Sequence, residues 1–460
     1  MIGSRQGTPS AVPPSRRNSR ALAPEGSPQL PPSRYAVRTA SLVARRVGSD
    51  KNFGSRSSGG RSFSSDKKLA SLSGALAPEA PGPVSPSADD NPMLRALTLA
   101  RRGVALAHPN PMVGAVLVKN GRIIAEGFHT YDRRDHAEIV ALKKAGKKAR
   151  GATLYVTLEP CCTSGRTGPC TKAIIAAGIK NVYAAMEDPN PAVAGRGFAE
   201  LKRAGIHIHL SKVFKGRAEA LNEDFAKYVR TGLPFVTLKT ALTLDGQIAS
   251  RAGSTTWITS AKSLEEVQRL RHQADALLTG IGTVLADDPR MSDRTGEPRR
   301  RRLLRAIVDS RLRTPLRSKL VKSAENDVVV FTTKRADSPK ARALLRAGVE
   351  VFQVRPRNGH VDLQAVIREL GRREMLNVLL EAGAELNGAA IQSGIVDKMI
   401  LFYAPKVMGT GGVPMARISS KWFEKSPPLK NISVKTCGPD FVVQGCFHDV
   451  YRDHRARRKN

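Results

Sequence analysis

The sequence predicts an α/β protein with two folded domains behind a polar N-terminal extension. Strand-like and helix-like segments alternate along most of the chain, which is typical of α/β folds. The composition changes near residue 90, and a second series of strand–turn–helix segments begins after Leu221. We therefore expect five parts: an extension at 1–90, a first domain at 91–215, a connector at 216–232, a second domain at 233–452 and a basic tail at 453–460.

The extension is rich in serine and proline. Residues 1–90 contain 18 serines and 11 prolines, and segments so poor in apolar residues stay disordered. They also hold 13 basic and 6 acidic residues, a balance typical of an organelle transit peptide. No amphipathic start is evident, so we favour a disordered extension, or upstream sequence that is not translated. We expect a cytoplasmic protein, with organelle import as the alternative, and no secretory signal because an apolar core is missing.

The composition of the whole chain limits its partners. The 460 residues carry a net charge of +35, which suits anionic ligands but also non-specific nucleic-acid contacts. Aromatic residues make up 5%, and no pattern of stacking residues indicates a single-strand binder, so no specific nucleic-acid partner is expected. We expect the arginines at 299–302 and the basic residues at 455–459 to form solvated loops or tails. No apolar stretch is long enough for a transmembrane helix.

The first domain places polar groups where strands lead into helices. A turn at Pro109-Asn110-Pro111 precedes an apolar strand at 112–118. Helical spacing follows at 136–145, then a strand at 152–158 and a second helix at 170–177. Such crossings are where open α/β sheets tend to hold their sites.

One imidazole, two thiols and one carboxylate form a catalytic zinc motif in this domain. His136, Cys161 and Cys170 supply three ligands, and a catalytic zinc keeps its fourth position open for water. The metal lowers the pKa of that water to about 7. Glu138 is not needed as a ligand and can move a proton from the water to a departing amine. The alternative is a structural zinc site or a set of unrelated buried thiols. Clustering of three of the five cysteines near the motif also favours a reducing compartment.

The spacing between the two cysteine ligands distinguishes this chain from most nucleobase deaminases. Nucleobase deaminases usually read P-C-x-x-C, but here eight residues separate Cys161 from Cys170. This loop, with Gly165-Arg166-Thr167 and a second Pro-Cys, resembles the deaminase half of the bifunctional riboflavin-biosynthesis deaminase/reductase. The resemblance implies a cytidine-deaminase-like three-layer α/β/α domain, in which Asn110 contacts the pyrimidine edge. Thr163 stands where that family usually has a histidine, and Cys162 is an additional thiol.

The second domain has its own pattern. A strand at 234–241 leads to a turn at 244–246 and a helix that contains Arg271. Gly280-Ile281-Gly282 and a later glycine at 383 follow apolar runs, and glycine-containing strand ends can hold phosphates at the next helix. No G-x-G-x-x-G run stands in a suitable context, so a Rossmann fold is not expected. The residues alone leave an unspecified α/β domain.

Most of residues 233–450 resembles the reductase half of the same bifunctional family, whose fold is similar to dihydrofolate reductase. The resemblance implies an NADPH site lined by Ala241, Trp257, Thr283, Asp287, Ser310, Gly383, Ala384, Glu385, Leu386, Asn387, Gly388 and Ala389. It implies substrate contacts from Thr255, Arg271, Met291, Arg294 and Glu381. Arginine suits a ribose phosphate because its side chain is always charged and can donate two parallel hydrogen bonds to the phosphate. No strong proton donor stands out; Asp287 and Glu381 are the candidates.

The resemblance implies a bifunctional enzyme of riboflavin synthesis that uses Zn²⁺ and NADPH. Its first domain would deaminate 2,5-diamino-6-ribosylamino-4(3H)-pyrimidinone 5′-phosphate, and its second would reduce the ribosyl group to ribityl. The partner is then a small phosphorylated pyrimidine, and the family associates into homo-oligomers through the reductase domain. Two alternatives are a nucleic-acid or tRNA-base deaminase with an accessory domain and a zinc-stabilised RNA-binding protein.

Overall fold

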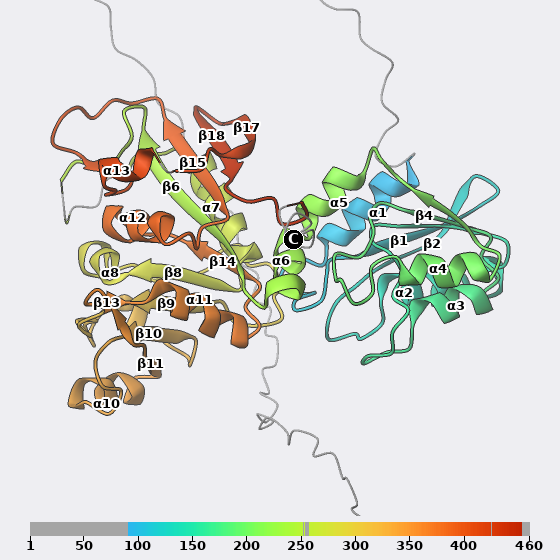
Figure 1. Ribbon diagram of the computed structural model, residues 1–460, viewed down its shortest axis with the longest axis horizontal. Coiled ribbons are helices and arrows are strands. Elements are labelled where there is room, and N and C mark those ends of the chain that lie inside the picture. Colours follow the sequence, from blue (N-terminus) through green and yellow to red (C-terminus); the bar gives the residue numbers. More distant parts are fainter. Residues whose placement is uncertain (1–90, 252, 254–256, 425, 453–460) are drawn as a thin grey trace, which may run out of the picture. The chain divides into compact units, whose positions relative to one another are not determined.

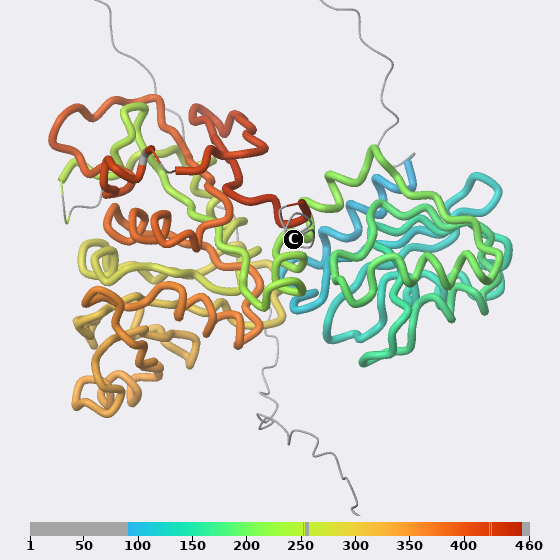
Figure 2. The backbone as a smooth tube through the Cα atoms, in the orientation of Figure 1, coloured from blue at the N-terminus to red at the C-terminus, as the bar shows by residue number. Residues whose placement is uncertain are grey.

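The computed structural model describes residues 91–452, apart from 252, 254–256 and 425. The predicted extension at 1–90, the predicted basic tail at 453–460 and the predicted substrate residue Thr255 lie outside the described residues. The described chain is built on two large sheets, one of five strands and one of nine, with helices between the strands along the chain (Figure 1). The α/β class predicted for both domains is confirmed. The backbone can be followed from one sheet to the other through the green segments of Figure 2.

The first sheet has the strand order β2-β1-β3-β4-β5. Its first three strands in that order pair antiparallel, and β3, β4 and β5 run parallel. The strands are β1 (Gly114–Lys119), β2 (Arg122–Phe128), β3 (Thr153–Val156), β4 (Asn181–Ala184) and β5 (His207–Leu210). The helices are α1 (Pro92–Arg101), α2 (Ala137–Ala145), η1 (Gly146–Ala149), α3 (Cys170–Ala176) and α4 (Arg196–Arg203).

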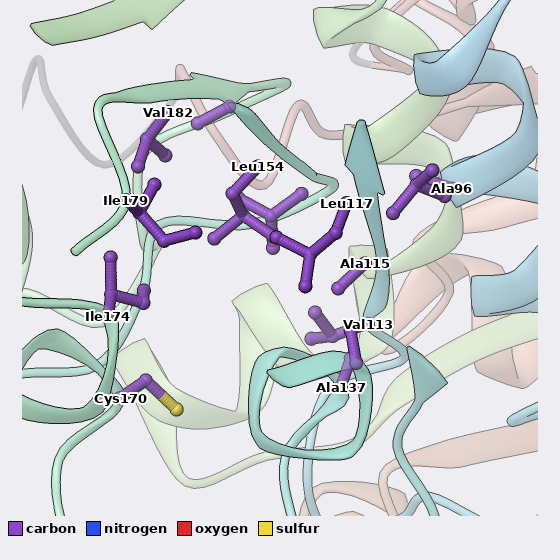
Figure 3. Packing of buried hydrophobic residues seen from close by; sticks show 14 of the residues in the cluster. Ala96, Val113, Ala115, Leu117, Ala137, Leu154, Cys170, Ile174, Ile179 and Val182 are labelled. Carbon is purple, nitrogen blue, oxygen red and sulfur yellow. The ribbon is translucent and has the colours of Figure 1, made fainter. Parts of the chain in front are cut away.

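An apolar core holds these helices on the sheet. Leu117, Leu154 and Ile174, from β1, β3 and α3, are fully buried and lie toward one another in Figure 3. Gly127 allows a close approach, because a Cβ there would lie 2.2 Å from the carbonyl oxygen of Ala137. The start of α2 therefore rests directly on β2, which brings the first turn of that helix down to the sheet.

The second sheet has the order β11-β10-β9-β8-β14-β6-β15-β18-β17. Neighbouring strands are parallel from β11 to β15, and β18 and β17 add an antiparallel edge. The strands are β6 (Phe235–Thr243), β8 (Ala276–Gly280), β9 (Leu304–Val308), β10 (Val328–Thr332), β11 (Val349–Gln353), β14 (Asn377–Leu380), β15 (Lys398–Ala404), β17 (Lys430–Cys437) and β18 (Asp440–Cys446).

Helices and two small ladders complete the described part of the chain. The connector region forms α5 (Lys215–Leu221) and α6 (Glu223–Thr231). The later helices are α7 (Ala261–Gln273), α8 (Ile281–Asp287), α9 (Lys319–Lys322), α10 (Pro339–Arg346), α11 (Leu363–Arg372), α12 (Ala384–Gln392) and α13 (Ser420–Phe423). The two-stranded ladders pair β12 (Pro356–Arg357) with β13 (His360–Val361) and β16 (Val413–Pro414) with β7 (Gln247–Ala249).

The predicted elements are found with shifts of one or two residues at their ends. The helices expected at 136–145 and 170–177 are α2 and α3, and the strands expected at 112–118 and 152–158 are β1 and β3. In the segment 299–302, Arg299 and Arg300 differ from the expectation of a solvated loop, whereas Arg302 is 64% exposed as expected. Arg299 donates to the Ala274 carbonyl and pairs with Asp293, and its side chain is only 17% exposed. Within the described residues, no helix combines the length and the apolar character that a membrane span requires.

Candidate functional site

Three ligand atoms gather where β3, α2 and α3 meet. The ligand atoms of His136, Cys161 and Cys170 all lie within 4.8 Å of one another. His136 Nδ1 is 3.4 Å from Cys161 Sγ and 3.3 Å from Cys170 Sγ. Nitrogen and sulfur ligands placed tetrahedrally around zinc would be about 3.3–3.8 Å apart, given their usual bond lengths. The donor set and its spacing therefore fit a zinc ion.

Local chain geometry brings each ligand there. His136 is the residue that caps α2, and Cys170 is the first residue of α3. Cys161 follows β3 in an irregular turn, and its sulfur accepts a hydrogen bond from the Cys170 backbone N–H at 3.4 Å. Two helix N-termini thus meet at the cluster, and their free N–H groups favour negative charge such as thiolate.

The thiol electrostatics agree with a cation site. Hydrogen bonding from the Cys170 thiol is the main cause that lowers the pKa of Cys161 to about 4, with a further contribution from His136. The pKa of Cys170 is raised because it is the donor of that bond and is buried beside the Cys161 thiolate. Since metal ligation requires both groups as thiolates, a bound cation would reverse the second shift.

Glu138 lies in the first turn of α2, next to the ligand cluster. Its side chain is 3% exposed, and burial raises its pKa to about 7. The neighbouring His136 acts in the opposite direction, and the thiol of Cys170 shares a hydrogen bond with the carboxyl group. A carboxyl group with such a pKa can accept and release a proton at neutral pH, as a general acid–base requires.

The extra thiol, Cys162, is not part of the cluster. Among the described residues, the only group of three or more potential ligands consists of His136, Cys161 and Cys170. Cys162 is half-buried, and burial raises its pKa. Cys161 is therefore the better placed of the two adjacent thiols to ligate a metal.

Asn110 reaches the same site through a histidine that the motif search missed. Asn110 Nδ2 lies 3.0 Å from His129 Nε2, and the rings of His129 and His136 meet edge to face at 5.2 Å. His129 Nδ1 faces the Asp135 carbonyl at 2.9 Å, and burial lowers the pKa of this histidine. His129 is thus neutral, with Nδ1 donating to the carbonyl and Nε2 free to accept from Asn110. Its place at the end of β2 was the signal in the sequence.

Glu159 is a second missed residue. Its buried carboxylate accepts backbone N–H bonds from Asp188 at 3.1 Å, Gly195 at 2.9 Å and Phe198 at 3.1 Å. These bonds tie the segment after β4 to the residue that precedes Pro160 and Cys161. Burial raises the pKa of Asp188 to about 6, with a contribution from the nearby Cys161. In the sequence, the signal for Glu159 was its position: a carboxylate that stands between an apolar strand and the Pro160-Cys161 pair.

The second domain holds an ion pair between two predicted substrate residues. Arg271 donates from Nε and Nη2 to the two carboxylate oxygens of Glu381, at 2.8 and 2.9 Å. Burial alone would raise the pKa of Glu381, but Arg271 and Lys239 lower it overall. Glu381 is therefore ionised and is not a proton donor at neutral pH.

Lys239 interacts electrostatically with this pair, and the sequence pattern indicated only that it belongs to a strand. It stands in the middle of β6, and burial lowers its pKa below the usual lysine value. Its ammonium lies 5.7 Å from the Phe402 ring centroid. A charged residue inside an apolar strand is costly unless it has partners or a role, which was the signal available in the sequence.

The residues predicted to line the NADPH site are placed unevenly. Gly383 is the N-cap residue of α12; a Cβ there would meet no atom within 4 Å, and no side chain caps the helix. Asn387 and Gly388 face the interior instead: Asn387 donates to the Met415 carbonyl, and a Cβ on Gly388 would lie 2.1 Å from the Arg417 carbonyl oxygen. The remaining predicted residues of this helix are buried at Ala384, partly buried at Leu386 and exposed at Glu385 and Ala389.

The other predicted residues of the second domain also differ in exposure. Trp257 is 76% exposed, whereas Met291 is 4% exposed and packs in an apolar cluster. Ser310 accepts a hydrogen bond from the Val361 N–H. Thr283 and Asp287 belong to α8, while Ala241 is a partly buried residue of β6 and Arg294 is exposed. The structure thus brings Arg271 and Glu381 together and places Met291 in the core.

Two family models match the chain. The model for the cytidine and deoxycytidylate deaminase zinc-binding region matches residues 86–186. The model for the RibD C-terminal domain matches residues 234–443. The first match contains the ligand cluster, and the second contains the second sheet up to residue 443, which lies within β18.

Full-length relatives combine both domains. The riboflavin biosynthesis protein RibD of Escherichia coli is 40% identical over 375 residues, which are 79% of this chain and 99% of that protein. The chain belongs to the RibD family. The RibD of Actinobacillus pleuropneumoniae is also 40% identical, over 76% of this chain and 93% of its own.

Solved structures agree. Acinetobacter baumannii RibD matches with a TM-score of 0.69 and 36% identity, over 78% of this chain and 98% of that one. A Thermotoga maritima protein matches with a TM-score of 0.65 and 36% identity, over 77% and 97%. It is described as a diaminohydroxyphosphoribosylaminopyrimidine deaminase/5-amino-6-(5-phosphoribosylamino)uracil reductase. As a member of the RibD family, the chain is a bifunctional deaminase and reductase of riboflavin biosynthesis, with Zn²⁺ and NADPH as cofactors.

Substitution of the adjacent thiols tests the ligand geometry. Cys170→Ala should lower the zinc content of the purified chain well below one equivalent, because only His136 and Cys161 remain. Cys162→Ala is the matched control and should retain zinc, since Cys162 lies outside the ligand cluster. Metal analysis by mass spectrometry after dialysis measures both. Loss of zinc from the Cys162 variant alone would contradict the assignment.

Proposed function

We propose that the chain converts 2,5-diamino-6-ribosylamino-4(3H)-pyrimidinone 5′-phosphate in two steps. The first domain removes the amine hydrolytically and releases ammonia. The second domain reduces the ribosyl group with NADPH to give 5-amino-6-(5-phosphoribitylamino)uracil. The observation that carries the proposal is the position of Glu138, a buried carboxyl group with a pKa of about 7, beside the His136, Cys161 and Cys170 cluster.

For deamination we assign His136, Cys161 and Cys170 as the zinc ligands. When bound, zinc supplies a Lewis acid that activates the attacking water. Glu138 takes the proton of that water and delivers it to the departing amine. The burial of Glu138 supports this role, because desolvation raises the pKa of its carboxyl group to about 7.

We propose that Asn110 contacts the pyrimidine edge and that His129 orients it. The side-chain amide of Asn110 is 3.0 Å from His129 Nε2, and His129 is itself held by the Asp135 carbonyl. This chain of hydrogen bonds limits the rotation of Asn110 and keeps its amide group beside the ligand cluster. The segment held by Glu159 brings Asp188 to the same side of the site.

For reduction we propose that Lys239 supplies the proton. When bound, NADPH would supply the hydride for C1′ of the open, imine form of the sugar. The proton goes to the imine nitrogen, and Lys239 is the group beside the Arg271–Glu381 pair whose pKa is lowered toward that task. Arg271 and Glu381 bind the substrate. The open N-terminus of α12 at Gly383 supports a phosphate contact with the cofactor.

The domain limits that we propose are 91–215 for the deaminase, 216–232 for the connector and 233–452 for the reductase. The five cysteines are all free thiols, and two are proposed as metal ligands, which suits a reducing compartment such as the cytoplasm. The substrate partner is a small phosphorylated pyrimidine.

We also propose that the chain forms a homo-oligomer through the edge of the reductase sheet. β17 is the last strand of that sheet, and seven of its eight residues are exposed. Two of them are large and apolar, Ile432 at 61% and Val434 at 65% exposure. An exposed strand with apolar side chains readily pairs with a second chain. Val434→Glu should therefore reduce the oligomer measured by sedimentation velocity, and a monomeric parent chain would refute the idea.

The two-step reaction is tested with the zinc-loaded full chain and the proposed substrate. Ammonia release without NADPH, followed by NADPH oxidation only after deaminated product forms, is the expected result. Glu138→Gln should keep its zinc and lose about 10²–10⁴-fold in deamination rate, because it cannot move the proton. Its reductase rate with supplied intermediate should be unchanged. An undiminished deamination rate in this variant would contradict the role of Glu138. If the parent chain neither released ammonia nor oxidised NADPH, the proposal would be contradicted.

Lys239→Met tests the reductase assignment. The variant keeps the length of the side chain but has no proton to give, so the rate of NADPH oxidation with supplied intermediate should fall about 10²-fold or more. Ammonia release in the same preparation is the internal control and should be retained. Lys239→Arg keeps the positive charge but holds its proton too tightly to donate it. A low reductase rate in this variant as well would show that proton donation, and not the charge alone, is needed. An unchanged reductase rate in the methionine variant would rule out Lys239 as the donor.

A further inference from the structure

Two guanidinium groups lie over the ring of Tyr131. The Arg166 Cζ is 4.0 Å from the ring centroid, and the Arg300 Cζ is 3.6 Å from it. Both guanidinium groups are therefore within the range of a cation–π contact with this ring. Each such contact is attractive because the quadrupole of the ring makes its face electronegative, and a cation is drawn to it.

The two arginines come from different domains. Arg166 belongs to the segment between the ligands Cys161 and Cys170. Arg300 precedes β9 of the reductase sheet. The Tyr131 ring therefore links the loop between the zinc ligands to a residue from the other catalytic half of the chain.

Arg300 is held firmly on the deaminase side of this link. Its Nη1 donates to the His108 carbonyl at 2.9 Å, and its Nε lies 3.3 Å from a carboxylate oxygen of Asp132. Its backbone N–H donates to the Ala105 carbonyl at 2.9 Å. With 18% of its side chain exposed, Arg300 is partly desolvated, which strengthens these contacts.

The neighbouring Arg302 has no part in this arrangement. It pairs with Glu325, and both side chains are more than 60% exposed. Glu325 belongs to the reductase domain. Arg302 is therefore a matched control, since it has the same residue type and lies two positions away on the same segment.

The loop between the zinc ligands has little else to hold its tip. Residues 163–167 form neither helix nor strand. Within the described chain, the hydrogen bond from Arg166 Nη1 to the Tyr131 carbonyl, at 3.4 Å, is the one bond that joins this tip to another segment. The charge of Arg166 reaches the deaminase site, because it contributes to lowering the pKa of His129.

We propose that Arg300 is a positioning residue for the deaminase: through Tyr131 it holds Arg166, and with it the loop between the zinc ligands, ready for a phosphorylated substrate. The proposal rests on the function proposed above. It makes deamination depend on a residue of the reductase domain, with no contact between Arg300 and the reacting atoms.

The expected signature is a change in KM without a change in chemistry. Arg300→Ala in the zinc-loaded full chain should raise the KM for deamination about 3- to 10-fold, the range that loss of one cation–π contact gives. The deaminase kcat, the zinc content and the reductase rate with supplied intermediate should stay the same. Arg302→Ala should match the parent chain in every one of these measurements.

A double-mutant cycle shows whether Tyr131 transmits the effect. Tyr131→Phe keeps the ring and should behave like the parent chain, whereas Tyr131→Leu should raise KM as Arg300→Ala does. Because both changes break the same link, the double variant should be no worse than Tyr131→Leu alone. Arg300→Lys keeps a cation over the ring and should recover part of the effect.

The outcomes separate this inference from the proposed function. A parent chain that releases no ammonia contradicts the function itself. An active parent chain whose KM is unchanged by Arg300→Ala, or whose two single effects add fully, contradicts the link through Tyr131. Equal losses from Arg300→Ala in both activities, or loss of zinc, would mean that Arg300 only stabilises the fold.

Discussion

The deaminase half depends on three side chains from separate segments meeting within 4.8 Å. His136, Cys161 and Cys170 meet there because α2 rests on β2 at a glycine and because α3 starts at its own ligand. The meeting of two helix N-termini makes the point electropositive before any ion binds. Hydrogen bonds from the Cys170 thiol and from His136 lower the pKa of Cys161, whereas burial in the same place raises the pKa of Glu138. One arrangement thus prepares both the ligands and the proton carrier.

The reductase half uses charge differently. Its central feature is the two-pronged Arg271–Glu381 pair, with Lys239 close by inside an apolar sheet. Pairing keeps Glu381 ionised despite its burial, so the proton needed with the hydride comes from elsewhere. The lowered pKa of Lys239 reflects the cost of holding an ammonium in that environment. In the reductase mechanism that we propose, the Arg271–Glu381 ion pair binds the substrate and the destabilised Lys239 cation supplies the proton.

The arginine segment before β9 shows how the two halves constrain each other. Arg299 and Arg300 are largely buried, although a run of four arginines in a sequence is usually solvated. Their charge is offset by carbonyls, carboxylates and one aromatic ring rather than by water. Part of the large positive charge of the chain is thus structural, and only the remainder contributes to attracting anionic ligands.

The sequence by itself predicted the α/β class and the two helices α2 and α3, which the structure confirms. It also predicted His136, Cys161 and Cys170 as one ligand set, and the structure brings these three side chains together. These features depend on residue type and short-range spacing. A ligand motif in particular needs only a few histidine and cysteine residues at suitable positions. Tertiary structure decided which thiol of Cys161 and Cys162 joins the cluster, because that depends on the direction of a turn after β3. It also decided the surroundings of Asn387 and Gly388, which contact the backbone of Met415 and Arg417, respectively. Glu159, Lys239 and Arg300 could not be found by spacing alone, because their partners lie far away in the chain and meet them only in the folded structure. His129 has nearer partners, Asn110 and Asp135, but no ligand motif includes it.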